Sequence, residues 1–526
     1  METKISSQNS KFAGINRWLL AILLLAAFLR LFRIADYMTF LGDEGRDVLI
    51  VKHILEGDLT LLGPTASVGG FFLGPIYYYF MVPFLWLFGL NPVGPAVMVA
   101  LFGIATVYLV YHAGKKFFGE KAGLIASALY AVSPLVIAYS RSSWNPNLMP
   151  FFSLLGIIVV YQAVAKNSWR LFILLGILLG IAMQLHYLTT FFVVVIAVYL
   201  LFARLYLGQG VTLIKNFGQT LAGFLLGFSP FLAFEVRHGF PNINTVIRFM
   251  FGSTGETGFA GEKFTGIVGD VFFRLFGRLI TRFPPPEQVG LREDPAIALW
   301  YYGTAFLGMV SVGALIFLFV RAIGKNRSDV QKFGLLLFWF FISILLFGFY
   351  KKPIYDYYFG FIFPLPFLLV GFVLAKFYEA KKLAMAGKVL AVAIFLSLFL
   401  YNLDGMPFKH SPNRQLAQVE QISQFVLEKT EGQPFNFALL TLGNSDHGYR
   451  YFFELKNNPP VTIENEINDP ARKTVTDQLL IVCEDPNCKP LGDSLWEVAG
   501  FGRAEIAGEW QVSVVKVYKL THFNSF

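Results

Sequence analysis

Charged residues are scarce in this sequence. Asp, Glu, Lys and Arg make up only 15% of its 526 residues, whereas they are about one quarter of an ordinary soluble domain. Hydrophobic residues reach 55% and aromatic residues 17%. This composition excludes an ordinary soluble protein and predicts an all-α polytopic membrane protein.

Cysteine is almost absent. Cys483 and Cys488 form a C-x4-C pair in the polar C-terminal part, with no histidine cluster nearby. This spacing is a weak zinc signal. A small disulfide loop is favoured if this part faces an oxidising compartment, and two thiols are expected if it faces the cytosol. The same part contains no G-x-G-x-x-G, P-loop, H-E-x-x-H or nucleophile elbow, so we expect it to bind or shield rather than react.

Long apolar runs recur along the rest of the chain. At about 20 apolar residues for each membrane-spanning helix, they predict eleven spans. The runs cover residues 17–34, 94–113, 122–140, 148–165, 170–186, 188–207, 216–236, 297–320, 333–350, 354–375 and 386–403. No small-residue cleavage site follows the first run, so it is predicted to be a retained helix rather than a signal peptide.

A further apolar piece, residues 74–90, decides the topology. It is short and carries Pro83 in its middle. If it does not cross, every cluster of Lys and Arg between spans lies on the side of the N-terminus, as the positive-inside rule requires, and this placement also explains the net charge of +9. We therefore predict a cytoplasmic N-terminus, a re-entrant or interfacial helix within an outer segment 35–93, and an extracytoplasmic C-terminus.

Two domains are expected. Residues 1–403 hold the spans, and residues 404–526 read as a small α/β domain. In that domain, which α+β would also describe, a helix is predicted over 413–429, strands over 435–441 and 479–483, and one or two strands over 505–520. Within the outer segment 237–296, residues 267–283 predict an amphipathic helix on the membrane. Its stripe of Arg274, Arg278 and Arg282 is expected to face lipid headgroups.

The loop after the first span is unusually acidic. Residues 39–47 place Asp43, Glu44 and Asp47 at a membrane surface, where carboxylates suit proton abstraction or cation binding. The alternative is that Asp43 caps a helix over 46–56 and lies in a solvated loop.

Several outer-face cations run against the positive-inside rule. Arg46, Arg141, Lys351 and Lys352 lie in short outer loops, and Arg237 opens a longer one. A cation that topology does not need is a candidate for binding a lipid phosphate. The alternative is a solvated or headgroup-bound side chain.

Amides and aromatic rings gather at the same ends of the predicted spans. The side chains of Trp144, Asn145 and Asn147 are suited to binding sugar hydroxyls; alternatively, they cap the helix that follows. His186 lies alone at the turn between two predicted spans, where a histidine is more often a structural residue than a ligand. Tyr78 and Tyr357 belong to tyrosine-rich segments that suit a membrane interface or a sugar platform.

Together, these motifs resemble the GT-C superfamily of polyprenyl-phosphate-sugar-dependent glycosyltransferases, near the protein O-mannosyltransferases and the lipid A aminoarabinose transferases. The resemblance rests on Gly42-Asp43-Glu44, Gly74-Pro75 with Tyr77-Tyr78-Tyr79, Ser140-Arg141 with Trp144-Asn145-Pro146-Asn147, and the tyrosine and Pro-Leu-Pro run at 357–366.

The resemblance implies a GT-C-like fold and an inverting transfer of sugar from a polyprenyl phosphate to a protein, lipid or glycan hydroxyl. Asp43 would be the general base, with Glu44 assisting, and Lys351, Lys352, Arg141 or Arg237 would pair the leaving phosphate. Relatives often carry a carboxylate where this chain has Asn145 and Asn147, which puts a bridging divalent cation in doubt. No Trp-Trp-Asp motif occurs, which argues against the oligosaccharyltransferase branch.

Two other functions remain open at this point. A transporter or flippase for a lipid-linked or anionic solute would also need outer cations, but it predicts inverted repeats and polar residues at the bilayer midplane, which the sequence does not show. A non-catalytic scaffold would leave Asp43 and Glu44 unexplained.

Overall fold

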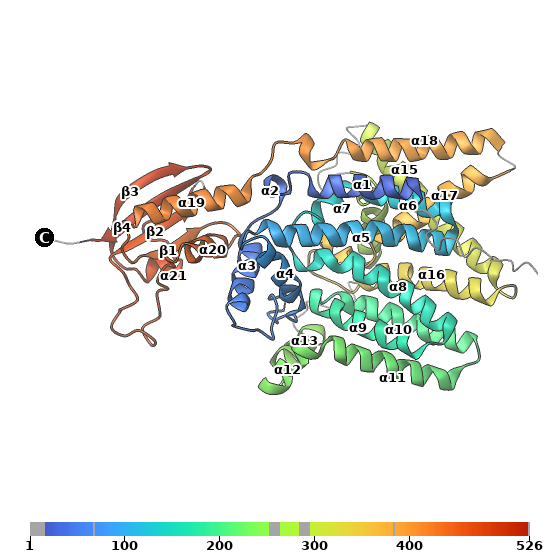
Figure 1. Cartoon of the computed structure of the whole chain (residues 1–526), viewed down its shortest axis with the longest axis horizontal. Coiled ribbons are helices and arrows are strands. Elements are labelled where there is room, and N and C mark those ends of the chain that lie inside the picture. The colour runs from blue at the N-terminus through green and yellow to red at the C-terminus, as the bar shows by residue number, and fades with distance from the viewer. Residues whose placement is uncertain are drawn as a thin grey trace, which may run out of the picture.

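The computed structural model describes residues 16–66, 69–251, 263–282, 295–381, 384–485 and 487–523. Lys4, Lys11, the glycine-rich stretch 252–261 and the prolines 284–286 lie outside the described residues. A body of helices running alongside one another fills one side of the molecule, and a smaller part containing the β-sheet lies at one end of it (Figure 1).

Each predicted apolar run falls on one helix or on two consecutive helices. The helices of the body are α1 (Arg17–Leu31), α2 (Ile34–Tyr37), α5 (Val93–Phe118), α6 (Glu120–Val132), α7 (Pro134–Tyr139), α8 (Met149–Lys166), α9 (Trp169–Leu185), α10 (Thr189–Tyr206), α11 (Gly210–Gly227), α12 (Ser229–His238), α15 (Pro295–Ala322), α16 (Arg327–Phe347), α17 (Pro364–Glu379) and α18 (Ala384–Leu403).

Among the described residues, six helices are long and apolar enough to cross a membrane. The pair α11 and α12, bent by 75°, would be a seventh span. The chain is thus a multi-pass membrane protein, but the predicted count of eleven spans is not confirmed. Several runs form shorter helices: α1 has 15 residues and rises about 22 Å, less than the roughly 30 Å of a hydrocarbon core.

The piece 74–90 forms a short helix, α4 (Ile76–Leu87), with Pro83 inside it. Its 12 residues rise only about 18 Å, which fits the predicted re-entrant or interfacial helix better than a complete span. Helix α4 packs against α5 and against α3 (Gly42–Leu55).

Helix α3 begins earlier than the sequence predicts. The spacing of apolar residues placed its start at Arg46, with Asp43 as a possible N-cap, but Leu41 holds the cap position and Asp43 lies in the first turn. The capping alternative for Asp43 is therefore wrong.

The arginine stripe of residues 267–283 does not face lipid headgroups, so that prediction is also wrong. Here α14 (Phe264–Phe273) continues into a π-helical turn, Arg274–Arg278. Arg278 Nε lies 2.6 Å from Asp356 Oδ2, Arg274 Nη1 lies 3.4 Å from Asp356 Oδ1, and Arg282 pairs with Asp404. Asp356 opens the 3-10 turn Asp356–Phe359 and is nearly buried. The stripe is therefore turned toward protein carboxylates.

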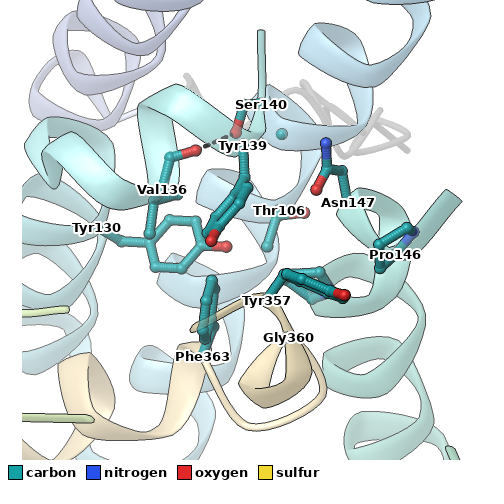
Figure 2. A pocket seen from close by; sticks show the side chains of 12 residues that line it. Thr106, Tyr130, Val136, Tyr139, Ser140, Pro146, Asn147, Tyr357, Gly360 and Phe363 are labelled. Carbon is teal, nitrogen blue, oxygen red and sulfur yellow. Dashed lines mark hydrogen bonds between the residues drawn. The ribbon is translucent and has the colours of Figure 1, made fainter. Parts of the chain in front are cut away.

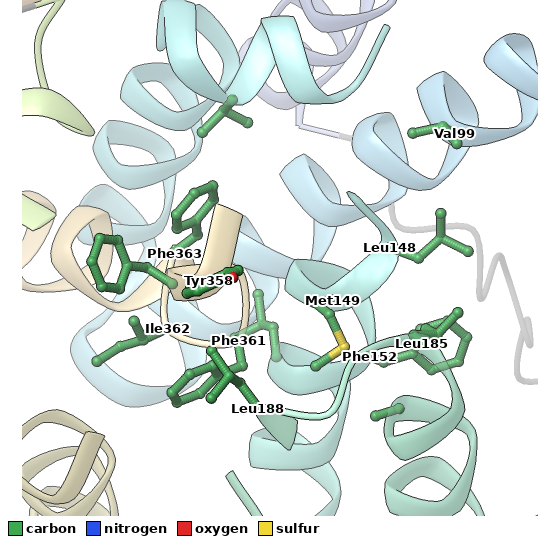
Figure 3. Close-up of a cluster of buried hydrophobic side chains, with 14 of the residues drawn as sticks. Val99, Leu148, Met149, Phe152, Leu185, Leu188, Tyr358, Phe361, Ile362 and Phe363 are labelled. Atoms are coloured by element: carbon green, nitrogen blue, oxygen red, sulfur yellow. The ribbon is translucent and has the colours of Figure 1, made fainter. Parts of the chain in front are cut away.

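A buried cluster fixes the loops that follow α7 and α16 (Figure 3). Leu148 and Met149, at the start of α8, join Leu185 and Leu188 at the turn between α9 and α10, and the segment 358–363 packs beside them. In a membrane protein such side chains are held by close van der Waals packing rather than by removal from water. The cluster holds the Trp144–Asn147 segment close to Tyr357.

The C-terminal part is built around a four-stranded sheet of order β1-β2-β4-β3. Strand β1 (Asn436–Leu440) pairs parallel to β2 (Gln478–Cys483), and β4 (Val515–His522) pairs antiparallel to β2 and to β3 (Ala504–Val512). Its helices are α19 (Gln415–Lys429), α20 (His447–Leu455) and α21 (Trp496–Ala499). The predicted helix and strands are thus present, whereas α20 was not predicted.

Two further features of this part bear on the site. Cys483 and Cys488 form a disulfide. Helix α20 packs against α3, so the end of the chain contacts the acidic segment near its beginning, as the view of Figure 1 also shows.

Candidate active site

A cavity of about 480 Å³ lies where three distant segments meet. The first segment leads into α3, the second is the end of α7 with its following loop, and the third follows β1. Its lining residues are Thr39, Leu41, Gly42, Asp43, Glu44, Ala138, Tyr139, Ser142, Trp144, Asn147, Gly443, Asn444 and Ser445. The structure therefore brings the predicted Asp43, Glu44, Trp144 and Asn147 into one cavity.

Asp43 is the accessible carboxylate of this cavity. Its side chain is 56% exposed, and its Oδ1 lies 2.8 Å from Arg46 Nη1, one helical turn further along α3. Helical spacing of three residues places such side chains next to each other. A carboxylate that is accessible, held in place and on a cavity wall can accept a proton from a bound hydroxyl.

Asp47 occupies the inner side of the same helix and is fully buried. Its Oδ1 accepts hydrogen bonds from Arg46 Nε at 3.0 Å and Nη2 at 2.7 Å. Burial nevertheless raises the pKa of Asp47 to about 6. Tyr78 interacts with both Asp47 and Arg46. Arg46, predicted as a phosphate ligand, is therefore shared between two carboxylates.

Glu44 is nearly buried, with 6% of its surface exposed. Its Oε2 accepts a hydrogen bond from the Leu41 backbone N–H at 3.1 Å. Burial raises the pKa of Glu44 to about 7, an effect that the hydrogen bond from Leu41 only partly offsets. A carboxyl beside Asp43 that titrates near neutrality suits the predicted assisting role.

Asn147 presents an unused acceptor. Its Nδ2 donates to the Ser142 carbonyl at 2.9 Å, and because a carbonyl only accepts, this bond fixes the orientation of the amide. Its Oδ1 is buried and has no hydrogen-bond partner among the described residues. Asn147 also borders a second, narrow cavity of about 20 Å³ (Figure 2), which has room for about one water molecule.

Trp144, His186 and Tyr357 come together beside the larger cavity. The Trp144 ring centroid lies 4.3 Å from that of Tyr357, and the His186 centroid lies 5.8 Å from it. His186 is nearly buried, and its Nδ1 accepts from the Leu188 N–H at 3.3 Å. Of the three, only Trp144 lines the cavity; the other two support it.

Asn145 binds the backbone rather than the cavity. It is 5% exposed, and its Nδ2 donates to the Leu185 carbonyl at 2.5 Å. This bond ties the Trp144–Asn147 turn to the end of α9.

The other predicted phosphate ligands lie outside the cavity wall. The Arg141 guanidinium is buried and donates to the Leu29 and Phe32 carbonyls, both at 2.8 Å, at the end of α1. Arg237 is exposed near the end of α12, and Lys351 and the half-buried Lys352 follow α16. No Lys or Arg is among the described residues that line the cavity.

In the described part of the chain, no three His, Cys, Asp or Glu side chains are grouped so that they could hold a metal ion. What the lining side chains themselves offer is proton transfer by carboxylates and hydrogen bonding by amides and hydroxyls.

The sequence analysis did not name every residue that lines the cavity. Ser142 could have been found, because it lies within the motif of residues 140–147; its hydroxyl donates to Thr39 Oγ1 at 3.0 Å. The segment 443–445, however, follows β1 some 400 residues from Asp43. Only the folded structure places it on the cavity wall.

The family model described as "Dolichyl-phosphate-mannose-protein mannosyltransferase" matches residues 73–234. Among curated proteins, "Putative mannosyltransferase YycA" of Bacillus subtilis (strain 168) is 26% identical over 272 residues, which are 48% of this chain and 38% of the relative. "Putative mannosyltransferase YkcB" of the same organism is 30% identical over 94 residues, 18% of this chain and 13% of the relative. The matches thus span less than half the length of these relatives.

Solved structures resemble the chain over most of its length. ArnT from Cupriavidus metallidurans, bound to undecaprenyl phosphate, matches with a TM-score of 0.63 and 13% identity, covering 96% of this chain and 98% of ArnT. The archaeal oligosaccharyltransferase AglB from Archaeoglobus fulgidus, in complex with an inhibitory peptide and a dolichol-phosphate, matches with a TM-score of 0.51 and 14% identity, covering 88% and 69%. These findings confirm the resemblance to the GT-C glycosyltransferases drawn from the sequence: the chain shares the fold of these solved structures over most of its length, and its residues 73–234 match the mannosyltransferase family model.

Proposed function

We propose that the protein transfers a sugar from a polyprenyl-phosphate donor to an acceptor hydroxyl, with inversion at the anomeric carbon. The observation that carries this proposal is the position of Asp43, whose half-exposed carboxylate lies on the wall of the 480 Å³ cavity together with Trp144 and Asn147. The solved ArnT and AglB structures of similar fold hold polyprenyl phosphates.

In the proposed reaction, Asp43 takes the proton of the acceptor hydroxyl. The hydroxyl oxygen forms a bond to the anomeric carbon on the face opposite the phosphate, and the bond from that carbon to the phosphate oxygen breaks. The polyprenyl phosphate leaves with the electron pair of that bond. Glu44, the nearly buried neighbour of Asp43 in the sequence, has a pKa raised to about 7, so it would gain or lose its negative charge near neutral pH.

The sugar would lie against Trp144 and Asn147. Asn147 is among the residues that line the cavity. Its buried Oδ1 has no partner among the described residues, so a sugar hydroxyl would supply the missing donor. The indole of Trp144 offers an apolar face, and Tyr357 backs it at 4.3 Å.

The leaving phosphate requires cations, because negative charge develops on it as the bond breaks. Lys351 and Lys352 would supply such cations, since they follow Tyr350, whose hydroxyl lies 2.8 Å from that of Tyr187, and Tyr187 stacks on His186. Arg46 reaches the site through its pair with Asp43, and Arg237 lies in the outer segment. Arg141 supports the end of α1 instead, because its guanidinium is held by backbone carbonyls.

We place this reaction on the extracytoplasmic face, in a transmembrane domain of residues 1–403 capped by an extracytoplasmic domain of residues 404–526. Support comes from the predicted topology, in which the basic clusters between spans fall on the side opposite the acidic loop. The proposed step assigns no part to a divalent cation.

The test is transfer from radiolabelled polyprenyl-phosphate sugar in membranes that carry Asp43→Asn. General-base loss predicts a fall of about 100-fold or more. Asp36→Asn is the matched control, because Asp36 is also paired with an arginine three residues away, Arg33, but does not line the cavity. Undiminished transfer by Asp43→Asn would remove Asp43 as the base. Mass spectra of lipids and glycans from cells with and without the protein would then identify the sugar and its acceptor.

A further inference from the structure

The start of α3 and the segment after β1 approach each other closely. A Cβ added to Gly42 would lie 2.0 Å from Ser445 Oγ and 2.7 Å from Ser445 N, and a Cβ added to Gly45 would lie 2.3 Å from Gly448 N. Any side chain at either position would force the two backbones apart. The C-terminal part therefore sits directly against the turn of α3 that carries Asp43 and Glu44.

Asn444 supplies a hydrogen bond that α3 cannot make for itself. The N-cap residue of α3 is Leu41, whose side chain has no acceptor for the free N–H groups of the first turn. Asn444 Oδ1 accepts instead from the Gly42 N–H at 2.7 Å and from its neighbour, the Ser445 N–H, at 2.9 Å. The helix is thus capped by a residue 402 positions away.

Glu484 determines which way this amide points. Asn444 Nδ2 lies 3.1 Å from both carboxylate oxygens of Glu484. Because an ionised carboxylate only accepts hydrogen bonds, the amide nitrogen must face Glu484 and the amide oxygen must face Gly42. Glu484 is held in turn by the hydroxyls of Thr441 at 2.9 Å and Tyr449 at 2.8 Å. It also lies inside the loop closed by the Cys483–Cys488 disulfide.

We infer that Asn444, oriented by Glu484, is a positioning residue for the Asp43 carboxylate. Asn444 fixes the first turn of α3, and Asp43 follows Gly42 directly, so the location of the proposed base depends on this pair in the C-terminal part. This inference rests on the proposed function. A misplacement of the order of 1 Å at a reacting group can cost about 100-fold in rate.

Exchanging the amide of Asn444 and the carboxylate of Glu484 between the two positions tests the inference. In Asn444→Asp, two carboxylates face each other, and we expect kcat to fall about 10-fold or more while the KM for the donor changes less than about threefold. In Glu484→Gln, the amide of Asn444 loses its fixed orientation, and we expect a smaller fall. In the double variant, the new amide at position 484 donates to the new carboxylate at position 444. That carboxylate still accepts from the Gly42 N–H, so kcat should return to within about threefold of the parent.

Asn468→Asp is the matched control. Asn468 Nδ2 donates to Glu464 at 3.2 Å in an exposed pair of the same C-terminal part, and this variant should leave kcat unchanged. A double variant no more active than Asn444→Asp, or an Asn444→Asp variant with the parent kcat, would overturn the inference.

Hydrogen exchange separates this inference from the proposed function. Deuterium uptake in the peptide that covers Gly42 to Asp47 should rise in Asn444→Asp and return to the parent level in the double variant, whatever reaction the protein catalyses. Unchanged uptake in Asn444→Asp would overturn the positioning role. If uptake responds as expected while Asp43→Asn retains full transfer, the proposed function fails and the contact with α3 stands.

Discussion

Asp47, which is fully buried, receives two hydrogen bonds from the single guanidinium of Arg46. The same guanidinium reaches the exposed Asp43 at 2.8 Å. One arginine therefore links a carboxylate inside the protein to a carboxylate on the cavity wall. This arrangement makes the stability of α3 and the charge of the cavity depend on one side chain.

Replacing Arg46 with Met should destabilise the protein far more than replacing Asp43 with Asn. Arg46→Met leaves the Asp47 carboxylate buried without its partner, which costs about 3–5 kcal/mol. Asp43→Asn breaks an exposed pair worth about 0–1 kcal/mol. Thermal unfolding of both variants in detergent measures the difference. Equal transition temperatures for the two would show that Asp47 does not rely on Arg46.

Glu44 should make stability depend on pH. Burial raises its pKa from 4.5 to about 7, so the folded protein binds this proton more tightly than the unfolded chain does. The contribution of Glu44 to the free energy of unfolding is therefore fully present below about pH 4.5 and is lost as the pH rises to about 7, a loss of up to about 3 kcal/mol.

Glu44→Gln should remove this share of the pH dependence. Asp47 contributes in the same direction, with its pKa raised to about 6, so the difference between the parent and Glu44→Gln isolates Glu44. Transition temperatures measured between pH 4.5 and 8 provide the comparison. Parallel curves for the two proteins would contradict the assignment.

Gly45→Ala should separate α3 from α20. The added Cβ would meet the Gly448 backbone at 2.3 Å, and forced shifts of this kind cost about 1–3 kcal/mol. Gly218 in α11 is the control, because a Cβ there meets nothing within 4 Å, and alanine in a helix is favoured by up to about 1 kcal/mol. Gly45→Ala should lower the transition temperature and the transfer rate, whereas Gly218→Ala should lower neither.

Replacing Asn147 should change the kinetics of transfer, whereas replacing Asn145 should lower the stability of the protein. Asn147→Ala removes the unpaired Oδ1 at the cavity, and kcat/KM should fall about 10-fold if that oxygen binds the sugar. Asn145→Ala leaves the Leu185 carbonyl without its donor, which should cost about 1–3 kcal/mol of stability. A loss of stability for both variants without a kinetic effect for Asn147→Ala would remove Asn147 from the sugar site.

The sequence could predict what depends on local pattern. Each apolar run became helical because hydropathy and helix propensity act over neighbouring residues, and the short run with Pro83 became the short helix α4. Three residues of the site could be found because polar or indole side chains are unusual at the ends of apolar runs. These residues are Asp43, Trp144 and Asn147, and the structure places all three on the wall of one cavity.

What the sequence could not predict are the long-range partners. Arg274 and Arg278 have the spacing of a membrane-facing stripe, but Asp356, about 80 residues later, neutralises them. Arg141 lies where a phosphate ligand could lie, yet it binds the carbonyls at the end of α1. Position along the chain does not distinguish a cation that binds a lipid from one that binds the backbone.

The contact between Asn444 and Gly42 also has a consequence for biosynthesis. The ribosome makes the acidic loop about 400 residues before it makes Asn444, the residue that caps α3 beside the cavity. During most of translation, a newly inserted molecule would carry its carboxylates without the wall opposite them. The cavity would be complete only when the C-terminal part has been made and has folded against α3.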